Sequence, residues 1–227
     1  MRVELISYTP DPERLVAAAA RLCYSSRSAG QIMENFTPGE IQKLLETLLA
    51  MGHESPAEHV SFTFAVEGVS RVLSHQLVRH RIASYSQKSQ RYVSEKNFTY
   101  VTPPSLREHP EALKAYQDKI EEIRRLYRDL QALIPAEDAR YILPEAVTTN
   151  IICTFNARSL FNFFRLRCCR RAQWEIRELA EKMRTEVRKV APNLFARAGP
   201  SCETEGICYE GKYTCGRAKE IRRREGV

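Results

Sequence analysis

Three arginines and a histidine lie within one short polar segment, residues 79–92, which reads RHRIASYSQKSQRY. Arg79, Arg81 and Arg91 carry fixed positive charges, and serines and glutamines between them add short hydrogen-bonding groups. The segment contains no acidic residue to balance this charge. Guanidinium groups bind phosphate oxygens and base edges through a planar pair of donors. The segment is therefore either a solvated basic loop or a binding site for an anionic ligand.

A second group of arginines lies in NARSLFNFFRLR, residues 156–167, mixed with phenylalanines that must be buried. Arg158 and Asn162 are one helical turn apart and share a face. Arg167 lies nine residues after Arg158, so at about 100° per residue it points to the opposite side. We expect this helix to present polar groups in two directions, as it would if it were packed between the subunits of an oligomer.

Glycine-rich phosphate loops are missing from the sequence. The chain has 9 glycines and contains neither GxGxxG nor GxxxxGK[ST], so side chains must hold any nucleotide. A third candidate segment is GHESPAEHV, residues 52–60, in which Ser55 and Glu58 fit a capping box whose free N–H groups could bind phosphate. His53 and His59 flank this turn at a spacing that does not suit a metal site, so they either position the turn or contact a ligand.

The composition is that of a globular, basic protein. Of 227 residues 43% are hydrophobic, and the net charge is +7, which favours nucleic acid, nucleotides or acidic lipid as partners. The N-terminus lacks the apolar run of a secretory signal, and no uncharged apolar stretch reaches the roughly 18 residues needed to span a membrane. We therefore expect a cytoplasmic protein with no membrane partner.

The seven cysteines are an odd number, which in the cytosol indicates reduced thiols. Cys202, Cys208 and Cys215 lie together in a turn-rich segment near the C-terminus. A closed zinc site needs four ligands and no CxxC pair is present, so unpaired thiols are favoured over a metal site.

The elements that must position these residues follow from hydrophobic periodicity and capping signals. We expect strands at residues 2–7, 60–66 and 147–156, and helices at residues 11–24, 37–52, 70–81, 105–134, 157–167 and 176–190. This pattern indicates one α+β domain, residues 1–198, followed by a Cys-rich basic tail, residues 199–227. The end of the tail, RAKEIRRREGV, is expected to be mobile.

Three segments together resemble a known family. RHRIASYSQKS fits the signature of the flavin-dependent thymidylate synthases, which is RHR, seven residues and then serine. GHESPAEH and NARSLFNFFRLR…RAQWEI resemble two further segments of that family, in the same order and at similar spacing. The resemblance covers about residues 50–180. It implies a single domain of the thymidylate synthase-complementing type, with a central, mostly antiparallel sheet and long flanking helices.

The resemblance also implies an activity, which is the reductive methylation of dUMP to dTMP. Methylenetetrahydrofolate would supply the carbon, NADPH the electrons, and FAD would carry the hydride. The family is homotetrameric, and its active sites are shared between subunits. No nucleic acid takes part.

Residue roles are implied only where this sequence matches the family. The residues that would contact FAD are Ser55, Arg79, His80, Arg81, Gln87, Asn156, Arg158 and Asn162. The residues that would bind dUMP are Gln76, Arg79, Gln87, Ser89, Gln90, Arg91, Arg140 and Arg167. Of these, Arg167 matches the arginine that activates the uracil ring without a covalent bond to the enzyme. Gln87 stands where some relatives have Glu, so it can hydrogen-bond a ligand but cannot act as a base.

Three alternatives compete with this interpretation. The charge and the arginine clusters also suit a basic nucleic-acid-binding protein, although no recognised motif of that class is present. A flavin- and folate-dependent methyltransferase acting on a base in RNA would share the cofactor chemistry. Cys168 and Cys169, beside Arg167, could be nucleophiles, but no base is placed to form a thiolate, so they are expected to be packing or surface thiols.

Overall fold

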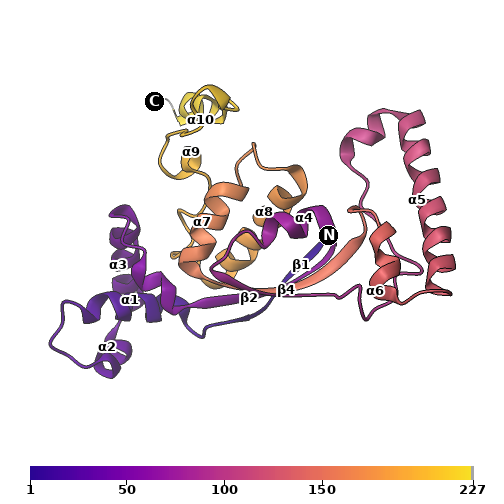
Figure 1. Ribbon diagram of the computed structural model, residues 1–227. Coiled ribbons are helices and arrows are strands. Elements are labelled where there is room, and N and C mark those ends of the chain that lie inside the picture. Colours follow the sequence, from indigo (N-terminus) through magenta and orange to yellow (C-terminus); the bar gives the residue numbers. More distant parts are fainter. Residues whose placement is uncertain (226–227) are drawn as a thin grey trace. The chain divides into compact units, whose positions relative to one another are not determined.

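The computed structural model describes residues 1–225 and contains a four-stranded sheet (Figure 1). The strands are β1 (Arg2–Tyr8), β2 (Ser61–Ser70), β3 (Ala83–Gln87) and β4 (Thr148–Asn156), in the order β1-β2-β4-β3. The amide of Thr9 donates to the carbonyl of Ser61, and that of Ala157 donates to the carbonyl of Val60. The ends of β1 and β4 therefore both lie beside the start of β2, which makes these pairs antiparallel. The α+β class and the antiparallel sheet are confirmed.

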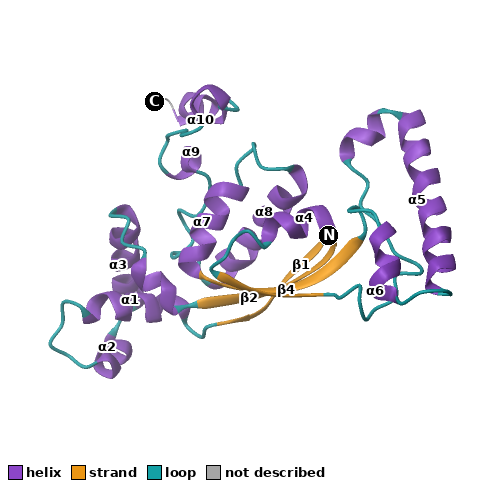
Figure 2. Cartoon of the chain, viewed as in Figure 1, coloured by secondary structure: helices purple, strands orange, loops and turns teal. Residues whose placement is uncertain are grey.

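Helices make up most of the remaining secondary structure (Figure 2). The α-helices are α1 (Pro12–Leu22), α2 (Ala29–Asn35), α3 (Pro38–Ala50), α4 (Arg71–Leu77), α5 (Pro110–Gln131), α6 (Ala136–Ala139), α7 (Ala157–Arg167), α8 (Trp174–Val190), α9 (Ser201–Thr204) and α10 (Arg217–Glu225). The 3₁₀ helices are η1 (Ser55–His59), η2 (Pro104–Glu108), η3 (Arg140–Ile142) and η4 (Gly211–Tyr213).

The described chain divides into two compact units. Unit 1 contains Met1–Arg2, Val66–Arg79 and Tyr85–Ile152, and unit 2 contains the remaining described residues. Strands β2 and β4 contribute residues to both units. In unit 1 the core is built around Phe98, Ile120 and Val147. In unit 2, α1 packs against α2, α3 and η1, and α7 packs against α8 and η1.

Strand β4 follows the predicted alternation, because Thr149, Ile151, Cys153 and Phe155 are buried while Asn150 and Ile152 are exposed. In β2 the alternation of buried residues changes at Gly68, whose φ of 68° is in the left-handed region. A glycine in this conformation allows one extra residue in a strand at low cost.

Helix α7 begins and ends at the predicted residues. The side chain of Asn156 accepts a hydrogen bond at 2.8 Å from the amide of Ser159, which caps the helix. Phe161, Phe163 and Phe164 are buried. The ring of Phe163 packs against Phe155 of β4 at 5.6 Å between centroids. This apolar side fixes the orientation of α7 and thus of its arginines.

Two predictions about helices were wrong. The helix expected over residues 70–81 ends at Leu77, and β3 follows it. Strand β3 has five residues, and Ser84 and Ser86 on its exposed side left no hydrophobic signal. The helix expected over residues 105–134 is divided into η2 and α5 at Pro110, which has no backbone donor. Residues 217–225 of the tail, expected to be mobile, form α10; residues 226–227 of that prediction lie outside the described residues.

Candidate active site

Arg167 and His80 form the central contact of the candidate site. The Nε of Arg167, at the end of α7, donates a hydrogen bond to His80 Nε2 at 3.0 Å. The edge of the His80 ring meets Phe163 with 4.9 Å between centroids. The imidazole is thus placed between a guanidinium and the aromatic core of unit 2. Sequence reasoning assigned both residues to one site but did not predict that they touch.

The protonation state of His80 follows from this environment. Burial, with a smaller contribution from the charge of Arg167, lowers the pKa of His80 from 6.5 to about 4. The imidazole is therefore neutral near pH 7. Because Nε2 accepts the hydrogen bond from Arg167, the proton of the neutral ring is on Nδ1. A neutral acceptor orients the guanidinium without cancelling its positive charge.

Arg158, one of the predicted flavin contacts, lies on another side of α7. Its guanidinium pairs with the carboxylate of Glu58 in η1, and both side chains are about half exposed. The two ends of α7 thus present arginines to different elements, as the helical spacing predicted. The capping box expected at Ser55 was wrong, because Ser55 is the first residue of η1 and Glu58 binds Arg158 instead of closing back on the backbone.

Asn156 and Asn162 are both predicted flavin contacts, and each already accepts a hydrogen bond within the protein. Asn156 caps α7 through its oxygen, which leaves the two hydrogens of its amide group as donors. The oxygen of Asn162 accepts a hydrogen bond from Arg165 at 3.0 Å. Asn162 and Arg165 line a cavity of about 200 Å³, together with Arg197 and Glu54. This cavity could hold a polar part of a cofactor.

Arg79 and Arg81 are exposed, and neither forms an ion pair with any residue that the structure describes. The hydroxyl of Ser55 is exposed as well. These two guanidinium groups and the hydroxyl are available as donors to an anion. Arg81 and Ser55 lie in unit 2 and Arg79 in unit 1. Donors of this kind are the groups that bind the phosphates of a cofactor such as FAD.

Several of the residues predicted to bind the substrate lie at or just after the end of β3. Gln87 donates a hydrogen bond from Nε2 to Thr149 Oγ1 of β4 at 3.2 Å, which fixes its amide. The hydroxyl of Ser89 accepts from the amide of Arg91 at 3.2 Å. Gln90 is only 8% exposed. Gln76 lies on α4 and is partly buried.

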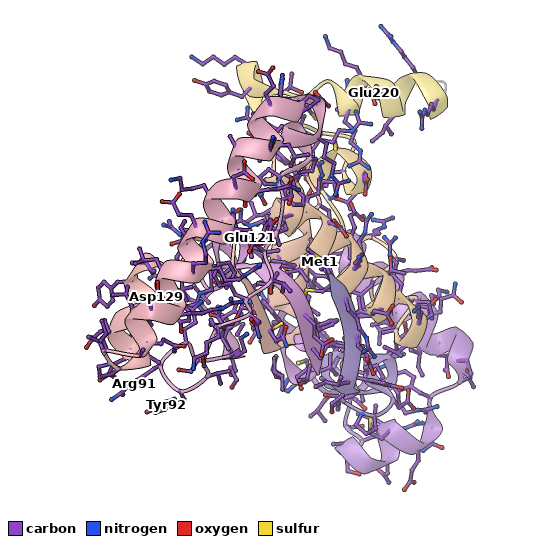
Figure 3. The ribbon with its side chains drawn as sticks, turned by 90° about the vertical axis from the view of Figure 1, so that its right-hand side faces the viewer. Met1, Arg91, Tyr92, Glu121, Asp129 and Glu220 are labelled. Carbon is purple, nitrogen blue, oxygen red and sulfur yellow. The ribbon has the colours of Figure 1, made fainter. Side chains whose placement is uncertain are left out.

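Arg91 and Arg140 are brought together by an acidic residue that sequence reasoning missed. Arg91 Nε binds the carboxylate of Glu137 in α6, and Arg140 Nε donates to the Glu137 backbone carbonyl at 3.0 Å. Arg91 also lies over the ring of Tyr92 at 5.3 Å. Figure 3 shows Arg91 and Tyr92 at an outer edge of unit 1, near the end of α5 that carries Asp129. The two arginines therefore form one cationic cluster.

The predicted contacts divide between the two units. Most residues assigned to FAD lie in unit 2, whereas Arg79 and Gln87 lie in unit 1. All residues assigned to dUMP lie in unit 1 except Arg167. The structure brings together Arg167 with His80 in unit 2, and Arg91 with Arg140 in unit 1.

The two thiols beside Arg167 are poorly suited to nucleophilic attack. Cys168 is fully buried, and burial raises its pKa to about 12, so the thiolate is scarce at neutral pH. Cys169 is partly buried. Within residues 1–225, no group of three or more His, Cys, Asp or Glu side chains could hold a metal ion. The same residues contain no helix that is long and apolar enough to cross a membrane.

Comparison with known proteins defines the family. Residues 4–193 match the thymidylate synthase complementing protein family. The chain is 48% identical to the flavin-dependent thymidylate synthase of Clostridium tetani, over 98% of this chain and 96% of the relative. It is 49% identical to the enzyme of the same name from Geobacter sulfurreducens, over 98% and 97%. The chain therefore belongs to the thymidylate synthase complementing protein family.

A solved structure shares the fold. The UMP/dUMP methylase of Streptomyces cacaoi, bound with 5-Br dUMP, superposes with a TM-score of 0.74 and 27% sequence identity. The match covers 86% of this chain and 93% of that one. This similarity extends the family assignment from sequence to three-dimensional structure.

Proposed function

We propose that this protein is a flavin-dependent thymidylate synthase that converts dUMP into dTMP. The names of the relatives from Clostridium tetani and Geobacter sulfurreducens support this activity, and the Streptomyces methylase supports a pyrimidine nucleotide as substrate. The observation in the structure that carries the proposal is the guanidinium of Arg167, held by neutral His80 at the end of α7. Methylenetetrahydrofolate provides the carbon and NADPH the reducing equivalents.

The chemical task is to make C5 of uracil attack a methylene carbon. C5 is a weak nucleophile, and its reactivity rises when negative charge on the ring oxygens and N3 is stabilised. Arg167, bound to the uracil edge, supplies this stabilisation. In a site that excludes water, a fixed cation lowers the free energy of the transition state by about 3 kcal/mol. FAD, when bound, supplies the hydride that reduces the methylene group to a methyl group.

No covalent bond to cysteine is needed in this scheme. The high pKa of Cys168 removes the nearest candidate nucleophile, and activation falls to Arg167. His80 acts on Arg167 and not on the substrate: as an acceptor it fixes the plane of the guanidinium. In the flavin-binding role, Arg79, Arg81 and Ser55 bind phosphate groups, and His80, Arg158, Asn156, Asn162 and Gln87 complete the set.

The phosphate of dUMP requires its own cations. We assign it to the cluster of Arg91 and Arg140, with Gln76, Arg79, Gln87, Ser89 and Gln90 as further contacts. Because Glu137 holds both arginines through Nε, the terminal nitrogens are the donors that would face a phosphate. We further propose a homotetramer in the cytoplasm, with active sites shared between subunits.

The experiment that tests the function uses the purified protein. It is expected to be yellow, to oxidise NADPH in the presence of dUMP and methylenetetrahydrofolate, and to form dTMP. A colourless protein that binds nucleic acid would support the alternative of a binding module. Methylation of a base in RNA, with no reaction of dUMP, would support the alternative methyltransferase.

A further inference from the structure

A cavity lined by two arginines lies in unit 2. None of the roles above is assigned to its residues. It has a volume of about 290 Å³ and is formed by α1, α2, the start of α3 and the loop between α1 and α2. Its lining residues are Arg21, Tyr24, Ser25, Arg27, Ile32, Asn35, Phe36 and Glu40. Two guanidinium groups and several hydrogen-bonding groups thus surround a cavity with an apolar floor.

The two arginines of this cavity are not neutralised by ion pairs. Arg21 and Arg27 are exposed, and among residues 1–225 neither forms a salt bridge. The carboxylate of Glu40 is already used, because it accepts hydrogen bonds from the amide and the hydroxyl of Thr37 at 2.9 and 2.7 Å. The hydrogen bonds from Thr37 and the charges of both arginines lower the pKa of Glu40. Glu40 is therefore ionised at neutral pH, and its single negative charge stands against the positive charges of Arg21 and Arg27. The lining of the cavity keeps a net positive charge.

Two apolar residues of the cavity lining are buried. Ile32 and Phe36 are 5% and 9% exposed, and the Arg21 guanidinium lies over the Phe36 ring at 6.0 Å. Arg14 donates from Nη1 to the backbone carbonyls of Met33 and Phe36, both at 2.9 Å, which fixes the end of α2. In contrast, the ring of Tyr24 is 85% exposed and can stack on a planar ligand.

We propose that this cavity binds the 2′-phosphoadenosine end of NADPH, with Arg21 and Arg27 on the 2′-phosphate and Tyr24 against the adenine. A phosphate monoester carries close to two negative charges and matches two guanidinium groups better than a carboxylate does. The inference rests on the proposed function, which requires this reductant. Helix α1 packs against η1, the element that carries Ser55, so the cavity belongs to the same group of helices as a flavin contact.

Binding of 2′,5′-ADP, measured by calorimetry on the flavin-loaded protein, tests the proposal without turnover. The wild type is expected to bind 2′,5′-ADP about tenfold or more tightly than 5′-AMP, because only the former carries the 2′-phosphate. Arg21→Gln with Arg27→Gln is expected to abolish this preference. The matched control is Arg107→Gln with Arg125→Gln, which removes two charges from exposed positions of unit 1 and is expected to keep it.

Kinetics give the second readout. In the cavity variant, KM for NADPH is expected to rise about tenfold, while flavin content, dUMP binding and KM for methylenetetrahydrofolate stay unchanged. Unchanged binding of 2′,5′-ADP by the cavity variant would overturn the proposal. Loss of affinity for folate triglutamate, with NADPH unaffected, would also overturn it and identify a site for the folate tail.

A single turnover separates this inference from the proposed function. Flavin reduced by dithionite needs no NADPH, so the cavity variant and the wild type should then form equal amounts of dTMP. If the wild type forms none, the proposed function fails. If it forms dTMP but the cavity variant keeps wild-type affinity for 2′,5′-ADP, only the inference about the cavity fails.

Discussion

At the scale of single residues, the proposed reaction is expected to depend on the shape and charge of Arg167. The hydrogen bond from Nε to His80 fixes the orientation of the guanidinium. We predict that Arg167→Lys keeps its flavin but that its kcat falls at least about a hundredfold. An ammonium group lacks the planar pair of donors, and it cannot donate to His80 while presenting such a pair to a ligand. Flavin absorbance and the rate of dTMP formation check this.

The control for this variant is Arg170→Lys, three residues further along the chain. Arg170 is exposed and pairs with Glu220, so its replacement should leave the rate near that of the wild type. Near-normal turnover in Arg167→Lys would contradict the role of Arg167 in activating uracil.

His80 leads to a prediction about pH. Its pKa is about 4 in the folded protein and near 6.5 in the unfolded chain, so the unfolded state binds the proton first as the pH falls. Stability present above pH 6.5 is therefore lost between pH 6.5 and 4. His80→Gln cannot bind this proton, so it should lose about 1 kcal/mol less stability than the wild type between pH 7 and 5, allowing for solvent screening of a partly exposed group.

Urea unfolding of both proteins at several pH values measures this difference. Activity provides an independent check, because protonated His80 cannot accept a hydrogen bond from Arg167. Parallel loss of stability in the wild type and in His80→Gln would show that other groups dominate the acid transition.

The sequence allowed candidate site residues to be named, but it did not indicate their partners in the structure. The signature segment pointed to Arg79, His80 and Arg81, but Glu137 was missed because it lies 46 residues from Arg91 and in no recognised motif. Glu58 was noticed for a different reason, and its partner Arg158 lies 100 residues away. Long-range pairs of charges leave no local pattern that a single sequence can show.

At the scale of elements, Asn156 caps α7 and is also a proposed flavin contact, and substitution can separate these two roles. Asn156→Ala is predicted to lower the free energy of unfolding by about 1 kcal/mol, because the cap of α7 is lost. Asn156→Ser keeps an oxygen that can cap the helix but lacks the amide donors. It should recover most of the stability and still bind FAD more weakly than the wild type.

Ser70 offers the matched control, since its hydroxyl caps α4 by accepting from the amide of Leu73 at 3.0 Å. Ser70→Ala should lose a similar free energy of unfolding, and its folded form should bind FAD as tightly as the wild type does. If Asn156→Ser binds FAD as well as the wild type, Asn156 is only a helix cap.

Elements with a strong apolar periodicity were the predictable ones. Helix α7 and strand β4 were predicted correctly because Phe161, Phe163 and Phe164 in the first, and Ile151 and Phe155 in the second, must be buried. Strand β3 was not predicted. It is an edge strand of five residues whose serines are exposed, so pairing with β4 stabilises it more than its own residue types do.

At the scale of the whole molecule, the proposed homotetramer is a prediction about surfaces. Leu166 of α7 is 50% exposed, and Ile6 and Tyr8 of β1 are 47% and 43% exposed. In the proposed tetramer, neighbouring subunits would cover apolar side chains of this kind. Sedimentation equilibrium is expected to give about four times the chain mass of 26.2 kDa. A monomer with full activity would exclude active sites shared between subunits.

The boundary predicted at residue 198 remains a prediction. Residues beyond it are connected to the rest of unit 2 by the ion pair of Glu220 with Arg170, and Cys202 is buried. The sequence of this tail shows charged residues and glycines but does not predict these contacts, because a charged side chain can equally well be solvated and unpaired.

The most direct test of the account compares dTMP formation by three flavin-loaded proteins supplied with dUMP, methylenetetrahydrofolate and NADPH. The wild type and Cys168→Ser with Cys169→Ser are expected to form dTMP at similar rates, whereas Arg167→Lys is expected to form almost none. A folded double cysteine variant without activity would show that a thiol adds to the uracil ring, and it would contradict activation by Arg167 alone.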